Sequence, residues 1–426
     1  MADQEQTVPA TPPPPPPPPP RAAPVAGAQR IETLDVLRGF AVLGILAVNI
    51  GYFADVSAVS MNPAVREAPS AAGWVVHTLM EVLAEGKFMT LFSVLFGAGI
   101  ALFSDRAEAR GRKPAGLHYR RLGWLWLIGM VHAYAIWYGD ILVTYACCGA
   151  VAYLGRRWRP RTQLIVAAVL VIGPALGLLG FAAALPHLPP EVMKGVRAGM
   201  APSAEALAAE VAAYRGGWLA QMPQRAEESI AMQTFILWFF SGPRVTALML
   251  TGMALLRLGV ITGERRDGFY TRLFAVGAVP GLLITVAGVA FNHRHGFSLE
   301  RSVLQAEFAN YWGSLLMAAA YLAAVALLVR SRAWPGLRRR LGAAGRMAFS
   351  NYLGQSLLCT TLFYGHGLGL YARVPGEWQA LVVAAVWALQ LWVSPWWLDR
   401  YRFGPAEWLW RSLTYAQAQP MTRRAG

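Results

Sequence analysis

Residues 31–50 have the sequence IETLDVLRGFAVLGILAVNI. It has the apolar density of a membrane-spanning helix, yet it carries Asp35, Arg38 and Asn49. A charge at the centre of a bilayer helix costs about 2.5–3.5 kcal/mol on insertion scales, so such residues face the interior of a bundle or reach the interface. The stretch therefore predicts a spanning helix with one polar edge.

The rest of the chain repeats this pattern. Of its 426 residues 56% are hydrophobic and 14% charged, and its apolar runs have the roughly 17–25 residues that a bilayer requires. The sequence predicts an all-α, polytopic helical bundle with about ten membrane spans. These are 34–53, 86–104, 122–138, 140–154, 163–185, 243–260, 273–291, 309–329, 347–365 and 378–398.

Charge indicates orientation and partners. The net charge is +15, but the basic residues lie in short loops between apolar runs, so we expect the lipid bilayer and not nucleic acid as the partner. With the N-terminus inside, the inner segments hold 26 Lys and Arg residues and the outer segments 8. Basic residues are retained on the cytoplasmic side. This bias predicts an N-in, C-in topology.

The chain divides into a membrane domain and two cytoplasmic tails. Residues 1–29 contain an unbroken run from Pro12 to Pro20, which predicts a disordered tail, or alternatively a site for a proline-binding partner. Residues 30–415 form the membrane domain, and 416–426 form a second tail. The outer segment 186–230 is amphipathic and predicts an interfacial helix or a lid.

The first span carries an aligned set of polar residues. Asn49 lies eleven residues beyond Arg38, which returns a helix to within about 20° of the same face. Asp35 lies one turn before Arg38 on nearly the same stripe. The pair of charges also fits a simple anchor at the inner interface, whereas an amide facing lipid would be unsatisfied.

The second span begins with a cation. Lys87 is followed at helical spacing by Thr90, Ser93 and Gly97, a stripe of small residues that lets another helix approach closely. Lys87 either snorkels outward or presents its charge to an anionic or carbonyl group in an outer cavity. Arg244 maps to the same outer half of the protein.

His132 lies inside a span, and Asp140 follows an outward turn at Gly139. A histidine in a helix is often a satisfied core residue. An intramembrane ionisable group near a carboxylate also fits a general base, because a neutral imidazole takes a proton from a hydroxyl while the carboxylate orients the ring. This interpretation makes His132 the base and Asp140 its partner.

The ninth span has a polar edge that includes Asn351 and Gln355, which also fits interhelical contact. The sequence shows no catalytic serine, P-loop or GxGxxG motif. The three cysteines lie in apolar runs, and the short His-Arg-His tract at 293–295 in an outer loop is weak evidence for a metal, so we expect neither a metal site nor a bound cofactor.

Five ordered motifs carry a resemblance to a known family. The chain resembles the YeiB-like bacterial inner-membrane proteins, whose common domain is domain of unknown function 418, over about residues 30–415. The motifs are LDVLRGFAVLGILAVNI, GKFMTLFSVLFGAGIAL, HAYAIWYGDILVTYA, GRMAFSNYLGQSLLCTTLFY and RFGPAEWLWRSLTY.

That family is similar to transmembrane acyltransferases, which implies a cytoplasmic donor such as acyl-CoA and a sugar or glycan acceptor on the far side. Bacterial O-acyltransferases typically place a catalytic histidine eleven residues after the arginine, where this chain has Asn49. An N-acetyltransferase branch keeps the Asn and places its histidine before the second span, near His77 here. His132 is preferred because it belongs to a family motif.

The resulting hypothesis is an acyltransferase-like membrane protein acting on the cell envelope. It assigns catalysis to His132 and Asp140, substrate binding to Arg38, Asn49, Lys87, Arg244 and Asn351 around a shared interior, and donor phosphates to Arg120, Arg121 and Arg346. The alternatives are a transporter for a small solute and a scaffold that binds partners through its proline tail. The pattern sets no oligomeric state.

Overall fold

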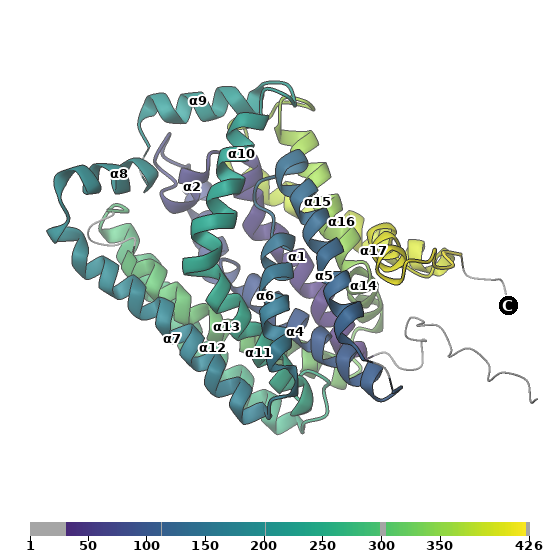
Figure 1. The fold of residues 1–426 in the computed structure, drawn as a ribbon. Helices are drawn as coiled ribbons and strands as arrows, with labels where there is room; N and C mark the ends of the chain where they lie inside the picture. Colours follow the sequence, from purple (N-terminus) through teal and green to yellow (C-terminus); the bar gives the residue numbers. More distant parts are fainter. Residues whose placement is uncertain (1–30, 112, 201, 299–303, 423–426) are drawn as a thin grey trace, which may run out of the picture. The chain divides into compact units, whose positions relative to one another are not determined.

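A computed structural model describes residues 31–111, 113–200, 202–298 and 304–422, which form a bundle of helices (Figure 1). Within these ranges the only β pairing is an isolated bridge between Tyr401 and Thr422. The all-α prediction is confirmed. The tail predicted at 1–29 lies outside the described residues.

The helices follow one another with short connections. Two of them, His132–Ile136 after α5 and Met232–Ser241 between α10 and α11, are π-helical. The α-helices are α1 Glu32–Ala54, α2 Ser57–Met61, α3 Ala71–Leu83, α4 Lys87–Glu108, α5 Ala115–Val131, α6 Leu142–Ala152, α7 Pro160–Ala184, α8 Pro190–Met200, α9 Ala204–Arg215, α10 Met222–Ala231, α11 Gly242–Arg257, α12 Asp267–Arg294, α13 Leu304–Arg330, α14 Pro335–Arg346, α15 Ala348–Phe363, α16 Gly376–Arg400 and α17 Pro405–Tyr415.

Several helices are long and apolar enough to cross a membrane. Among the described residues there are six, or up to seven if the bent pair Met222–Trp238 and Gly242–Arg257 forms one span. Every predicted span contains a helix. Helix α5, with 17 residues, is at the lower limit for a span, and α6, α11 and α15 have 11, 16 and 16 residues, less than a straight span requires. The structure thus supports a membrane protein, while the count of ten and the N-in, C-in orientation stay predictions.

The helices differ in how much of their apolar surface faces inward. In the apolar window of α1, 67% of residues are buried, against 11% in α7 and 28% in α12. The exposed apolar faces of α7 and α12 suit contact with lipid, whereas α1 is a core helix. A core position explains how a membrane helix can carry a polar edge.

Glycines bring pairs of helix backbones into contact. A Cβ built on Gly97 in α4 would lie 2.0 Å from the Met249 carbonyl oxygen, and one on Gly252 in α11 would lie 1.8 Å from that of Val94. This confirms the close approach predicted from the small-residue stripe. The first helix packs in the same way on α14, where a Cβ on Gly39 would lie 2.0 Å from the Leu341 oxygen.

Candidate functional site

Three buried side chains form a hydrogen-bonded triad of Ser356, His132 and Asp140. His132 Nδ1 is 2.8 Å from Asp140 Oδ1, and His132 Nε2 is 2.9 Å from Ser356 Oγ. The side chains of His132 and Asp140 are each 1% exposed, and Ser356 is 1% exposed. The structure therefore brings the two residues predicted for catalysis together and adds a serine to them.

The local sequence explains how His132 and Asp140 meet. Helix α5 widens into the π-helical turn that begins at His132, and the chain then leaves the helix at Trp137. Gly139 makes this turn possible, because a Cβ there would lie 2.3 Å from the Trp137 ring. Asp140 Oδ2 accepts the Val143 N–H at 2.8 Å, so one carboxylate holds the histidine and caps the start of α6.

Hydrogen-bonding chemistry assigns the proton on His132. An ionised carboxylate only accepts hydrogen bonds, so in the neutral imidazole Nδ1 carries the hydrogen toward Asp140 and Nε2 presents its lone pair to Ser356. A serine inside a helix usually donates to the carbonyl four residues earlier, as Ser93 does to Met89 at 2.8 Å. The hydrogen bond of Ser356 Oγ to that carbonyl is long, at 3.4 Å, and its contact with His132 Nε2 is shorter, at 2.9 Å, which favours donation to His132.

Aromatic rings enclose the triad. The rings of His132 and Tyr352 have centroids 5.2 Å apart, and Trp137 lies 6.3 Å from His132. Trp137 is 2% exposed, and its buried indole nitrogen makes no hydrogen bond within the described residues. A base, a carboxylate and an unused donor in a dry environment can move a proton and stabilise a developing negative charge.

Sequence reasoning missed Ser356. The polar edge of α15 was assigned to Asn351 and Gln355, and Ser356 is one residue beyond it, 100° around the helix. No serine motif surrounds it, and its partner His132 is 224 positions away in the chain, so no local pattern links the two residues. Its spacing of four from Tyr352, which packs on His132, was the available signal.

Lys87 and Arg244 form a second group, the cation cluster, together with Thr90, Asn310 and Ser314. Lys87 is fully buried, and its Nζ donates to the Glu81 carbonyl and to Asn310 Oδ1, each at 2.6 Å. Arg244 donates to Ser314 Oγ at 2.6 Å and to Thr90 Oγ1 at 3.3 Å. Both predicted substrate-binding cations thus bind neighbouring helices, although the buried Nε of Arg244 has no hydrogen-bond partner within the described residues.

A third group lies at the start of α1. Arg38 pairs with Asp35 at 3.4 Å and is 31% exposed. Arg121 stacks on the Trp410 ring at 4.3 Å, and burial, followed by the charge of Arg411, lowers the pKa of Arg121 to about 10, with a smaller contribution from Arg38. Positive charge is therefore concentrated here, as binding of donor phosphates requires.

The remaining predicted residues have separate places. Arg120 is exposed beside Arg121, and Arg346 is half-buried at the end of α14. Asn351 donates to the Ala344 carbonyl at 3.1 Å and to Ser394 Oγ at 3.2 Å, the interhelical contact that was the alternative for it. Asn49 is half-buried on α1. The predicted residues thus fall into several groups.

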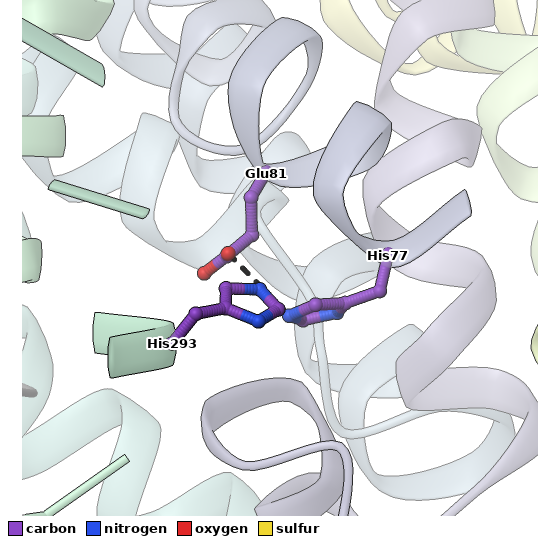
Figure 2. A group of neighbouring side chains, drawn as sticks. All are labelled: His77, Glu81 and His293. Atoms are coloured by element: carbon purple, nitrogen blue, oxygen red, sulfur yellow. Dashed lines mark ion pairs between the residues drawn. The ribbon is translucent and has the colours of Figure 1, made fainter. Parts of the chain in front are cut away.

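A cavity of about 570 Å³ lies on a different face of α1 from the triad. Gly51 and Tyr52 of α1 line it, while the next residue, Phe53, stacks on Trp137 at 4.0 Å. His77, the rival candidate for the base, also lines it, and with Glu81 and His293 it forms a group with metal-ligand spacing (Figure 2). Sequence reasoning expected no such group.

Comparison with known proteins gives a consistent family. Residues 255–417 match the family described as "Protein of unknown function (DUF418)". The chain is 32% identical to the uncharacterized protein YxaH of Bacillus subtilis (strain 168), covering 94% of this chain and 98% of that protein. It is 31% identical to the uncharacterized protein YeiB of Escherichia coli (strain K12), covering 92% and 98%. Because these similarities extend over nearly the full length of each relative, the chain belongs to the YeiB-like DUF418 family.

Proposed function

We propose that this protein is a membrane-embedded acyltransferase that moves an acyl group from cytoplasmic acyl-CoA to a hydroxyl of an envelope sugar or glycan, with His132 as the general base. The observation that carries the proposal is the triad. A buried imidazole held by a carboxylate on one nitrogen and facing a hydroxyl with the other is the arrangement that removes a proton from an alcohol.

Ser356 marks the place of the reacting hydroxyl in this proposal. Its Oγ lies 2.9 Å from Nε2, within the reach required of a general base and its substrate. Ser356 itself sits inside α15, where its backbone N–H belongs to the helix and cannot stabilise an oxyanion. An acceptor hydroxyl that displaces Ser356 from Nε2 therefore attacks the thioester directly, and the CoA thiolate leaves with the proton carried by His132.

The positive group around Arg38 and Arg121 supports the donor side of the proposal. Guanidinium groups bind phosphates with paired hydrogen bonds, and acyl-CoA carries several phosphates. The Trp137 indole N–H is a buried donor without a partner in the described part of the chain, and its ring centroid lies 6.3 Å from that of His132. Such a donor is available to the oxyanion of a tetrahedral intermediate.

The test uses inside-out membrane vesicles containing the full-length protein. Vesicles receive radiolabelled acetyl-CoA, and label is counted in the lipid and glycan fractions. His132→Gln keeps the size of the side chain but removes the base, so transfer should fall by at least about 10²-fold. His118→Phe is the matched control, because His118 is equally buried at 1% on the same helix and stacks on Tyr153 at 4.2 Å.

Ser356→Ala distinguishes two routes. Direct transfer predicts that it retains most of the activity, as does the control Ser93→Ala, another fully buried serine. Loss of transfer in Ser356→Ala alone, with label bound covalently to the wild-type protein, would make Ser356 the nucleophile. Transfer that is undiminished in His132→Gln, or absent from the wild type, refutes the proposed function.

Transport is the second candidate, favoured by one observation. The helices Met222–Trp238 and Gly242–Arg257 are bent by 62° at a short break, and broken helices are common where transporters bind solutes. In the same vesicles a transporter would accumulate a soluble compound in the lumen without covalent label in any fraction.

A further inference from the structure

The side chains of His77, Glu81 and His293 converge from two helices (Figure 2). His77 and Glu81 lie one turn apart on α3 and so share a face of that helix. His293 lies in the last turn of α12, which packs against α3. One potential ligand atom from each side chain lies within 4.8 Å of the other two.

The distances suit a metal ion. Zinc binds nitrogen and oxygen ligands at about 2.0–2.1 Å in tetrahedral geometry, which puts neighbouring ligand atoms about 3.3 Å apart. His77 Nε2 and Glu81 Oε2 are already 3.4 Å apart. The His293 ligand atom lies within 4.8 Å of the other two, so it completes the set if it moves inward by at most about 1.5 Å.

The polar atoms of this group lack other partners. His77 Nε2, Glu81 Oε2 and His293 Nε2 are buried and make no hydrogen bond within the described ranges. Buried polar atoms are nearly always satisfied in folded proteins. Apart from the 3.4 Å contact between His77 and Glu81, these ligand atoms have no partner in the described ranges, which favours a bound ion between them, and two imidazoles with a carboxylate suit Zn²⁺.

The surrounding structure holds the rings in place. Trp74 packs on His293 with ring centroids 5.0 Å apart, and Phe297 packs on the same histidine at 5.0 Å. Phe297 reaches this position with a φ of 56°, directly after Gly296 at 61°. A left-handed conformation costs a non-glycine residue about 1–2 kcal/mol, so packing against His293 is maintained against local strain.

One side of the group is open. His77 and Glu81 line the 570 Å³ cavity, as do Tyr52 and Glu85. Structural zinc sites use four protein ligands, whereas sites with three leave one position for water or substrate. The ammonium of Lys87 donates a hydrogen bond to the backbone carbonyl of Glu81 at 2.6 Å.

We propose that His77, Glu81 and His293 bind one Zn²⁺ ion whose fourth position opens into the cavity beside α1 and receives an anionic or hydroxyl oxygen of a ligand. This site is separate from the triad and does not depend on acyl transfer. It also gives His77 a role that does not compete with His132.

Metal content tests the site. The full-length protein, purified in detergent through a tag without histidines, is treated with chelator, incubated with Zn²⁺, separated from excess metal by gel filtration and analysed by elemental mass spectrometry. The wild type should retain one zinc per chain, and His77→Ala and His293→Ala should lose it. His295→Ala is the matched control, because His295 lies two residues from His293 but is exposed, and it should keep the ion.

A second variant separates metal loss from misfolding. His293→Cys supplies a different zinc ligand and should recover binding that His293→Ala loses. Wild-type protein without zinc, or folded alanine variants that retain as much zinc as the wild type, overturn the proposal.

The open position has its own test. Co²⁺ takes the place of zinc and absorbs visible light according to its coordination, so inorganic phosphate should shift the spectrum of the Co²⁺-loaded wild type. A spectrum unchanged by saturating phosphate overturns the open position.

Discussion

Asp140→Asn tests the triad most sharply, because Asp140 uses both carboxylate oxygens. Oδ1 accepts from His132 and Oδ2 accepts from Val143, each at 2.8 Å. Asparagine has one acceptor and one donor group, so it cannot satisfy both. If its oxygen stays on Val143, the NH₂ group faces His132 Nδ1 and forces the hydrogen of the imidazole onto Nε2.

The two orientations of the asparagine have different costs. In the first orientation the hydrogen is on Nε2, so His132 has no lone pair for a substrate hydroxyl. Loss of the correct tautomer in a comparable triad lowers the rate by about 10⁴-fold, which corresponds to about 5.4 kcal/mol of activation free energy. In the reversed orientation the buried Val143 N–H loses its acceptor, which costs about 1–3 kcal/mol of folding free energy. Because of this folding cost we expect the first orientation, with transfer reduced by about 10³–10⁴-fold.

The assay is acyl transfer in inside-out vesicles, with thermal unfolding in detergent measured on the same preparations. For Asp140→Asn we expect a large loss of transfer and a small change in unfolding temperature. Asp267→Asn is the control, since it removes a carboxylate from an exposed ion pair with Arg330, outside the triad and the donor group, and should leave transfer unchanged. Transfer by Asp140→Asn within threefold of the wild type would refute the assigned tautomer.

Three further predictions concern stability. Gly252→Ala should lower the unfolding temperature measured by fluorescence-detected gel filtration, because its Cβ would lie 1.8 Å from the Val94 oxygen. Lys87→Met should lower the free energy of unfolding by about 1.5–3 kcal/mol, because it leaves buried acceptors, including Asn310 Oδ1, without their charged donor. Burial, followed by a neighbouring arginine, lowers the pKa of His118 to about 4. Since the unfolded chain binds this proton more readily, the stabilising contribution is fully present above pH 6.5 and falls by up to about 3 kcal/mol as the pH drops toward 4. His118→Phe should flatten this acid dependence in unfolding measurements.

Matched variants control for these changes. Gly268→Ala places its Cβ in open space and should leave the unfolding temperature unchanged. Lys194→Met removes an exposed lysine and should be nearly neutral. Equal effects in test and control variants would contradict the packing and hydrogen-bonding arguments, and a pH profile that His118→Phe leaves unaltered would exclude His118 as its source.

Local sequence patterns predicted much of the helical framework. Hydrophobic run length located the helices, because apolar length is a property of consecutive residues. The spacing of small residues around Gly97 identified a packing face, and the pairing of His132 with Asp140 followed from a turn only eight residues long. Each of these inferences depends on residues close together in the chain.

Long-range placement could not be predicted in the same way. Ser356 reaches His132 across 224 positions, and His293 reaches His77 through the packing of α12 on α3. Lys87 was expected to line the same interior as His132. The sequence did not indicate Asn310 of α13, which binds Lys87 in the cation cluster. Helix periodicity gives the face of each residue but not the helix that covers it.

The contact between α1 and α14 has a consequence for biogenesis. Gly39 and Gly345 bring these backbones together, yet they are separated by about 300 residues, which a ribosome needs about 15–60 s to add. If α1 inserts into the bilayer as it is made, its surface at Gly39 therefore has no α14 backbone packed on it while the later segments are inserted. A nascent chain that ends before α14 therefore holds a first helix without α14, α15 and α16, all of which pack on it in the folded bundle.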